Sequence, residues 1–279
     1  MNGFILVNKQ KDVSSNFVVQ EIKKKIKAKK VGHTGTLDPL ASGLLVLAID
    51  RATKFSSYFL ESNKSYNVEV SLGISTDTDD STGNIISKSN DCPNEASVMK
   101  ELYRFKGESL QVPPFFSALK HKGKPLYYYA RKGEFISKPA RKIKVTDIDN
   151  FKYKNKICSF RIQCSKGTYI RSIARDLGEK LGCGAHMKSL TRISQGKFCI
   201  SKSKEISHIS KDDIISIESA FEDLDSITII PKDEKKFING VTISGLKKRD
   251  NIYRVYNKDN TFIGIGEIKD SFLNHKQLV

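Results

Sequence analysis

The densest run of glycine, proline and small polar residues lies at Gly32–Gly43 and contains a single carboxylate, Asp38. Pro39 disfavours the α conformation for Asp38, and the glycines allow sharp turns. The pattern predicts a carboxylate presented on a tight loop, where it could act as a nucleophile or a base. The structural alternative is that Asp38 is an N-cap with Pro39 at the first position of a short turn. The residues by themselves leave both interpretations open.

Three other patterns that could do chemistry are incomplete. Asp77–Gly83 has the spaced carboxylates of a calcium loop, but Thr82 stands where glycine is needed and Lys88 where the closing glutamate belongs. Gly182–Gly184 resembles a dinucleotide-binding loop but follows a predicted helix rather than a strand. The histidines have no serine or cysteine partner at a catalytic spacing, and the five cysteines include no C-x-x-C pair. A metal centre, a hydrolytic triad and a zinc-dependent base deaminase are therefore not expected.

Charge points to a polyanionic partner. The chain has 48 Lys and Arg against 31 Asp and Glu, a net charge of +17, which favours RNA or DNA over a membrane surface. One basic stretch runs from Lys120 to Lys144 and includes Tyr127–Tyr129, a mixture suited to phosphates and unstacked bases. The other lies in the predicted helix Asn16–Lys30, whose lysines form either a phosphate-contacting surface or a solvated face.

Apolar periodicity predicts the elements that position the Asp38 loop. In chain order these are a helix at Asn16–Lys30, a buried strand at Leu44–Ile49, a helix at Ala52–Leu60, strands at Tyr66–Leu72 and Ile157–Cys164, and a helix between Gly167 and Gly182. Asp38 is thus expected between a basic helix and a buried strand.

The length of 279 residues favours one large domain or two unequal ones. The composition turns acidic at Lys211–Asp225, which is predicted to be a linker, and Ile227–Val279 is predicted to be a small β module rich in glycine. No apolar run is long enough to span a bilayer, and the first residues lack the pattern of a secretory signal. Unpaired cysteines suit a reducing compartment, so a cytoplasmic protein is expected.

Several motifs together resemble one protein family. They are Gly32–Gly43 with the sequence GHTGTLDPLASG, Lys64–Tyr66, Thr76–Asp79, Pro113–Lys120, Tyr127 with Ala130–Arg131, Ser165–Arg171, Gly184–His186 and Phe262–Ile268. This set, in this order, resembles the TruB family of tRNA pseudouridine synthases over nearly the whole chain. Related synthase families carry an R-L-D-type loop in place of T-L-D-P, so the likeness is specific to this branch.

The resemblance implies an α+β pseudouridine-synthase fold, with a mixed, largely antiparallel central sheet and flanking helices. It implies a catalytic domain over residues 1–225, with an RNA-gripping insertion at about 113–145. A short PUA-like RNA-binding β domain is expected over residues 226–279. The activity implied is conversion of uridine to pseudouridine in the T loop of tRNA, at position 55, without cofactor or metal.

The resemblance also assigns roles to residues. Asp38 would be the catalytic aspartate, and Tyr66 would stack on the target base and act on its C5 proton. Arg171 would pair with Asp38, for which a guanidinium can use two parallel N–H···O contacts. Leu190 would pack beneath the base, and His33 would enter the space left by flipped nucleotides. Tyr169 is expected to bind substrate as well, and the basic residues expected to contact RNA are Lys64, Lys120, Lys122, Lys124, Arg131, Arg141 and Lys142.

Two further interpretations differ in class from a stand-alone enzyme. A non-catalytic RNA-binding or RNA-folding module could keep the fold, but it has no use for Asp38, Tyr66 and Arg171 together. A guide-RNA-dependent relative would need a sequence extension to recruit partner proteins, and none is seen. The expected partner is therefore the T arm of tRNA, bound by a monomer without guide RNA or membrane. Whether Asp38 attacks C1′ or C6, or acts at the 2′ position, is left open by the sequence.

Overall fold

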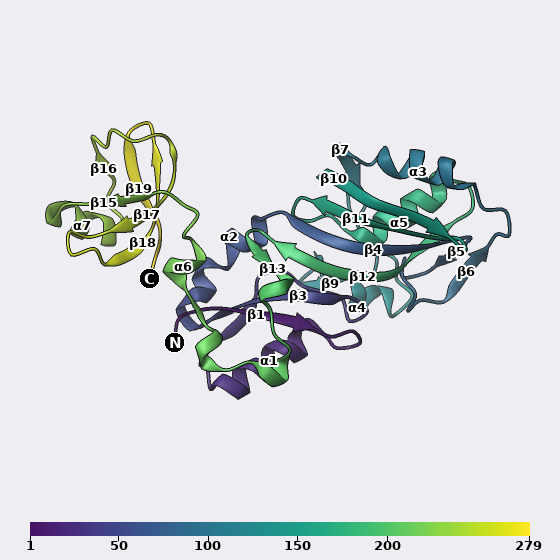
Figure 1. Cartoon of the computed structure of the whole chain (residues 1–279), viewed down its shortest axis with the longest axis horizontal. Helices are drawn as coiled ribbons and strands as arrows, with labels where there is room; N and C mark the ends of the chain where they lie inside the picture. Colours follow the sequence, from purple (N-terminus) through teal and green to yellow (C-terminus); the bar gives the residue numbers. More distant parts are fainter.

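In a computed structural model that describes residues 1–279, a sheet of ten strands forms the body of the molecule (Figure 1). Its strands lie in the order β14 (Ile215–Ser216), β1 (Gly3–Lys9), β3 (Ser42–Ile49), β12 (Ala185–Gln195), β4 (Lys64–Leu72), β11 (Ile157–Cys164), β10 (Arg141–Lys154) and β7 (Gly107–Gln111), with β2 (Val31–His33) beside β3 and β13 (Phe198–Cys199) beside β12. Only the β3–β12 pair is parallel. The expected mixed, largely antiparallel sheet is confirmed.

Helices flank this sheet and two hairpins extend from it. The helices are α1 (Ser15–Ile26), α2 (Ser56–Glu61), α3 (Glu95–Tyr103), α4 (Leu126–Ala130), α5 (Ile170–Lys180) and α6 (Ile217–Ala220). The hairpins are β5 (Ile74–Thr76) with β6 (Ile85–Lys88), and β8 (Lys120–His121) with β9 (Lys124–Pro125). None of the helices is both long and apolar enough to cross a bilayer.

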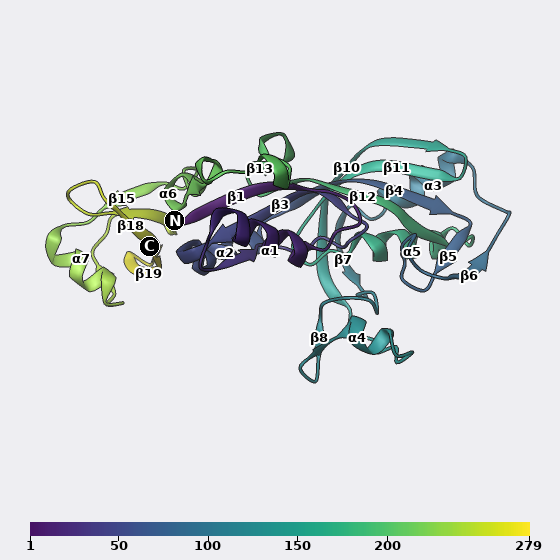
Figure 2. The same cartoon turned by 90° about the horizontal axis from the view of Figure 1, so that it is seen from below.

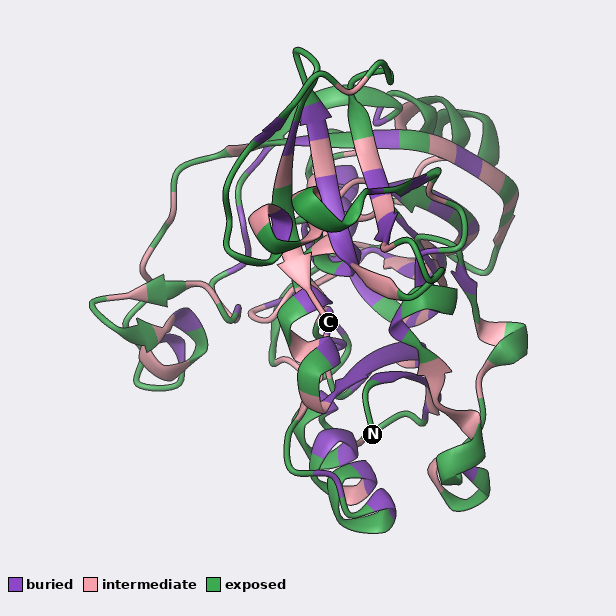
Figure 3. Ribbon diagram, turned by 90° about the vertical axis from the view of Figure 1, so that its left-hand side faces the viewer, coloured by how far each residue is buried: buried purple, intermediate pink, exposed green.

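Two apolar clusters cover the two faces of the sheet. On one face, α1 and α5 pack on alternate residues of the strands, among them Ile5, Leu47 and Val68. The opposite residues of β1 and β3 pack against α2, α6 and a phenylalanine cluster, which consists of Phe4, Phe55, Phe59, Phe198 and Phe221. The residues of β1 and β3 are almost all buried, on both faces of the sheet (Figure 3). This explains why the two strands are almost continuously apolar in sequence.

Helix α1 is shorter than predicted. Its first turn is capped by Ser14, whose side chain accepts a hydrogen bond from the Phe17 N–H at 3.0 Å. Lys27 takes a left-handed backbone conformation (φ +55°), which ends the helix at Ile26 rather than at Lys30. The predicted helix Ala52–Leu60 is divided into a 3₁₀ turn at Asp50–Phe55 and α2. The predicted strands and α5 lie where expected, within two residues.

The acidic segment Lys211–Asp225 is not a free linker. Its residues Ile215–Ser216 form β14, which pairs with β1, and Phe221 is buried against Phe59 with ring centroids 5.2 Å apart. The acidic side chains lie on the surface while the apolar ones join the core. The linker prediction rested on the acidic composition, which describes the surface of this segment. It did not account for the packing of the few apolar residues.

The insertion begins at Val112 and ends at Ala140, because β10 already pairs with β7 from Arg141. Residues 141–145, predicted as part of the insertion, therefore belong to the large sheet. Figure 2 shows β8 and α4 projecting well away from that sheet. The base of the insertion is fixed to α5, since the Val112 carbonyl accepts hydrogen bonds from Ser172 at 3.0 Å and Arg175 at 3.1 Å.

A second sheet of five strands makes up the C-terminal module. Its order is β15 (Ser226–Thr228), β17 (Asn251–Tyr256), β18 (Phe262–Lys269), β19 (Phe272–Leu278) and β16 (Ile243–Ser244), with α7 (Pro231–Ile238) beside it. The module packs against the large domain, because Ile265 of β18 is fully buried in the phenylalanine cluster of that domain. Tyr256 also donates a hydrogen bond to Glu218 of α6 at 2.8 Å.

Candidate active site

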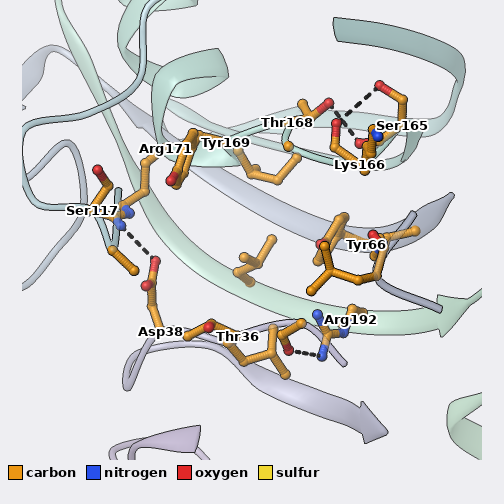
Figure 4. Close-up of a pocket in the computed structure, with 18 of the residues that line it drawn as sticks. Thr36, Asp38, Tyr66, Ser117, Ser165, Lys166, Thr168, Tyr169, Arg171 and Arg192 are labelled. Carbon is orange, nitrogen blue, oxygen red and sulfur yellow. Dashed lines mark hydrogen bonds and ion pairs between the residues drawn. The ribbon is translucent and has the colours of Figure 1, made fainter. Parts of the chain in front are cut away.

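A cavity of about 580 Å³ opens on the face of the large sheet that carries α1 and α5. Its walls come from the Asp38 loop, β4, the base of the insertion, the β11–α5 turn and β12 (Figure 4). Asp38, Tyr66, Tyr169, Arg171 and Leu190, five of the six residues expected to act on substrate, line it. The volume suits a small ligand or a single nucleotide.

The Asp38 loop is anchored on both sides of the carboxylate. Ser15 of α1 donates a hydrogen bond to the Leu37 carbonyl at 2.7 Å and accepts one from the Leu37 N–H at 2.8 Å. The Pro39 carbonyl accepts from the Asp12 N–H at 2.8 Å and from the buried ammonium of Lys9 at 3.3 Å. With Leu37 buried, the Asp38 side chain is left 37% exposed.

A short turn does begin at Pro39, where the Ala41 N–H donates to the Asp38 carbonyl at 3.0 Å. The Asp38 carboxylate does not cap this turn, because it is paired with Arg171 instead. The residues after Asp38 form a turn that leads into β3. One glycine of the loop is required by packing. Gly43 has φ +99°, and a Cβ there would lie 2.4 Å from the Arg192 carbonyl, where β3 runs against β12.

Arg171, in the first turn of α5, forms the predicted ion pair with Asp38. Its Nη2 lies 2.9 Å from Asp38 Oδ2, and the arginine side chain is only 6% exposed. The structure shows this single contact instead of the expected two-pronged one. The same Nη2 donates to the Phe116 carbonyl at 2.9 Å, and Nη1 donates to the Thr78 carbonyl at 3.3 Å. These carbonyls hold the guanidinium so that one nitrogen serves the carboxylate.

The sequence did not reveal the second carboxylate beside Arg171. Asp80 Oδ2 lies 3.7 Å from Arg171 Nε, and its Oδ1 accepts hydrogen bonds from Thr78 and from Thr82. The turn predicted at Asp77–Gly83 is confirmed, and its hydroxyls hold Asp80 in place. The density of Asp and Thr that suggested a calcium loop could have been interpreted as a self-bonded turn presenting one acidic group.

Tyr66 on β4 and Arg192 on β12 are neighbours across the two strands. Both are buried, and burial raises the pKa of Tyr66 to about 12, so its phenol is neutral at physiological pH. Arg192 donates to the carbonyls of Leu44 at 2.7 Å and Gly35 at 3.0 Å, which fixes the start of the Asp38 loop to the sheet. The sequence did not predict this role for Arg192. The feature that could have revealed it is its position two residues after Leu190, which places an arginine on the inward face of a strand.

The remaining predicted residues fall into separate places. Tyr169 lines the cavity with its backbone held by Gln111, and the Arg141 guanidinium stacks 4.7 Å from its ring centroid. His33 ends β2 and does not line the cavity, and burial lowers its pKa. Its Nδ1 has no hydrogen-bond partner.

The basic residues expected to contact RNA do not form one group. Lys64 is buried, and its ammonium donates to the carbonyls of Phe59, Leu60 and Ser62. Burial lowers the pKa of Lys64 to about 8, and the side chain serves as part of the wall rather than as an exposed phosphate contact. Arg141 and Lys142 line the cavity. The exposed residues Lys120, Lys122, Lys124 and Arg131 all lie on the insertion.

The insertion presents aromatic rings between these cations. The Tyr128 ring has the ammonium of Lys124 at 4.5 Å from its centroid and that of Lys132 at 4.7 Å. Arg131 lies over the ring of Tyr127 at 5.4 Å. Charge and stacking surfaces thus occur together on the insertion, whose base lines the cavity, and this combination is used to hold single-stranded RNA.

Comparisons with solved structures agree with this architecture. The chain superposes on the structure described as "Crystal Structure of a Cbf5-Nop10-Gar1 Complex" with a TM-score of 0.71 and 24% identity, over 99% of this chain and 84% of that one. It superposes on "Structure of H/ACA RNP bound to a substrate RNA containing 2'-deoxyuridine" with a TM-score of 0.72 and 22% identity, again over 99% and 84%. These two likenesses show that the chain shares the fold of those structures.

Sequence comparisons identify the branch. Residues 23–170 match the "TruB family pseudouridylate synthase (N terminal domain)", and residues 171–227 and 226–279 match the two C-terminal regions described for the same enzymes. The chain is 41% identical to the tRNA pseudouridine synthase B of Clostridium kluyveri and 40% identical to that of Clostridium acetobutylicum, over 97% of this chain and 96% of each relative. The chain belongs to the TruB family of pseudouridine synthases.

Proposed function

We propose that this chain converts uridine to pseudouridine in the T loop of tRNA, at position 55, with Asp38 as the catalytic carboxylate. The observation that carries the proposal is the partly exposed Asp38 carboxylate, ion-paired to a buried arginine in the same cavity as Tyr66. The relatives named tRNA pseudouridine synthase B cover nearly the whole chain, which supports tRNA as the substrate.

The reaction moves uracil from an N1–C1′ bond to a C5–C1′ bond, with no change in oxidation state. The target base must first leave its stack, and the aromatic face of Tyr66 and the apolar side chain of Leu190 can hold it in the cavity. Asp38 promotes cleavage of the N1–C1′ bond, either as a nucleophile at C1′ or C6 or as a base at the 2′ position. The base then turns and is joined to C1′ through C5, and any covalent bond to Asp38 is broken again. We place Tyr66 at the C5 proton: because its phenol is neutral, it passes its hydroxyl proton on to water as its oxygen takes the proton from C5.

Arg171 is a positioning residue for this carboxylate. Because its other donors are held by two backbone carbonyls, it fixes Asp38 within the cavity rather than following it. Binding of the RNA backbone is assigned to the insertion and to Arg141 and Lys142 at the cavity, acting in a monomer without guide RNA. The free cysteines agree with a cytoplasmic site of action.

The decisive experiment incubates the purified protein with an unmodified tRNA transcript and maps pseudouridine at single-nucleotide resolution. We expect one product position in the T loop, and none when that uridine is replaced by cytidine. Asp38→Asn should abolish product while tRNA affinity stays within several-fold of the parent, because binding is spread over many cations. Product formed by Asp38→Asn near the parent rate would refute the assignment.

Failure at two levels can be told apart in this design. No pseudouridine in any RNA, with tRNA still bound, would instead support a non-catalytic RNA-folding module. Pseudouridine at another position would keep the enzyme and overturn the T-loop assignment.

A further inference from the structure

Helix α1 ends in a cluster of cations that the cavity does not use. Lys23, Lys24, Lys27, Lys29 and Lys30 are all exposed, and none of their ammonium groups has a carboxylate oxygen within 4.0 Å, although the Lys30 backbone N–H donates to Asp50 at 2.9 Å. We call these five residues the α1 lysine patch. Lys25, among them in sequence, is different: its ammonium donates to the Ile206 carbonyl at 2.7 Å and also to that of Ser207.

Helix stability accounts for only part of the patch. Cations in the last turn of a helix are favourable, which covers Lys23 and Lys24. Lys27, Lys29 and Lys30 lie after the helix and gain little from it. Like charges this close repel one another, so the free protein carries an electrostatic cost that a polyanion would relieve.

The patch lies on the same face of the sheet as the cavity. Val18, Ile22 and Ile26 of α1 belong to the same apolar cluster as Leu37 of the Asp38 loop. The chain runs from Lys30 through β2 directly into that loop. Asp38 is the eighth residue after Lys30, so the two lie within about 28 Å even for a fully extended chain.

The patch and the insertion approach the cavity from different segments. The insertion supplies the wall at Ser117–Leu119, whereas α1 and β2 lead into the wall at Gly35–Asp38. In Figure 2 α1 lies beneath β1 and β3, away from the projecting β8 and α4. In the proposed function, the insertion holds the T-arm hairpin and the loop of that hairpin enters the cavity. The α1 side of the cavity then remains accessible to RNA that continues beyond the hairpin.

Resting on the proposed function, we propose that the α1 lysine patch binds backbone phosphates of a second segment of the same tRNA, outside the T-arm hairpin. Its role is affinity for the whole tRNA, and it takes no part in the chemistry. Contacts to phosphates carry no sequence information, so the patch would serve any tRNA with the common three-dimensional shape.

The test compares full-length tRNA with an isolated T-arm hairpin. The variant is the triple change Lys23→Gln, Lys24→Gln and Lys27→Gln, since glutamine removes the charge and keeps helix propensity at the two positions inside α1. We expect affinity for full-length tRNA to fall about tenfold or more near 0.1 M salt, with the log–log salt slope flatter by about two to three. Affinity for the hairpin should stay within about twofold, and the single-turnover rate at saturating RNA should be unchanged.

A matched control removes the same charge elsewhere. Lys152→Gln, Lys154→Gln and Lys156→Gln lie near the β10–β11 turn, roughly 40 Å along β10 from Arg141 at the cavity. This control should bind both RNAs within about twofold of the parent. Equal losses for hairpin and full-length tRNA would overturn the assignment to a second segment, and no loss for either would make the patch a solvated face.

A second measurement uses the unaltered protein, so it does not depend on how the variant folds. Lysine acetylation followed by mass spectrometry should show the α1 lysine patch protected by full-length tRNA and not by the hairpin. Lys25 should react slowly with or without RNA, because its ammonium is already engaged. Protection by both RNAs, or by neither, would overturn the proposal, whereas absence of pseudouridine in the parent reaction would overturn the proposed function instead.

Discussion

Replacing Arg171 by lysine should separate catalysis from binding. The arginine directs its nitrogens at four acceptors: the carboxylates of Asp38 and Asp80 and the carbonyls of Phe116 and Thr78. A lysine keeps the charge but has one nitrogen, which cannot stay close to all four. An ammonium that follows Asp38 gives up the carbonyls that fixed the guanidinium.

The magnitude follows from these contacts. Loss of one preorganised donor in an active site typically costs about 10²–10³ in rate, or about 2.7–4 kcal/mol of barrier. Leaving the Phe116 and Thr78 carbonyls without their partner should lower the free energy of unfolding by about 1–2 kcal/mol. Because the Arg171 side chain is 6% exposed, RNA affinity should remain within about threefold.

The assay measures single-turnover product formation, filter binding and thermal unfolding on the same preparation. Arg175→Lys is the control, since Arg175 lies one turn further along α5, pairs with Asp79 and Asp176, and does not line the cavity. It should lose stability without losing rate. A rate for Arg171→Lys within about threefold of the parent, under ~0.7 kcal/mol of barrier, would remove Arg171 from the active site.

Three further outcomes are expected. Arg192→Met should lower the free energy of unfolding, measured in urea, by about 1–3 kcal/mol, because the carbonyls of Leu44 and Gly35 lose their hydrogen-bond donor. Its rate should fall more than tenfold, and a parent-like rate would show that Arg192 does not position the Asp38 loop. Burial raises the pKa of Asp79 to about 6, so the folded chain binds more protons than the unfolded chain between about pH 4 and 6, and stability from this group falls as pH rises through that window. Asp79→Asn should therefore gain stability over the parent by up to about 3 kcal/mol from pH 4 to 6 in urea unfolding and level off above; a pH-independent difference would contradict the shift. Exhaustive chelation should leave the rate on a T-arm hairpin that folds without Mg²⁺ unchanged, and loss of activity there would point to a metal requirement.

The Asp38 loop was predictable from the sequence, because glycine and proline restrict or free the backbone at their own positions. The strands Tyr66–Leu72 and Ile157–Cys164 were predictable since each is buried on one face and alternates. The roles of Arg192 and Lys64 were not predictable, because they depend on residues far away in the sequence. Both are charged residues whose partners are backbone carbonyls from other elements, and no pattern in the sequence brings those carbonyls to them.

The ion pair of Asp38 shows the same limit at finer scale. That Arg171 reaches Asp38 followed from the resemblance, and the structure confirms it. That it does so through one nitrogen depends on Phe116, which comes from the insertion more than fifty residues earlier in the chain. Geometry of this kind is decided by tertiary packing rather than by the types of the two charged residues.

The phenylalanine cluster that joins the two sheets has a consequence for how the molecule unfolds. Ile265 of the C-terminal module is buried among side chains such as Phe55, Phe59 and Phe221 of the large domain, so neither part can open without exposing apolar surface of the other. Calorimetry should accordingly show a single cooperative transition, with equal calorimetric and van't Hoff enthalpies, rather than two. Cutting the chain at residue 225 would strip one wall from that cluster, and the shortened protein should melt at a lower temperature and tend to aggregate through the uncovered rings.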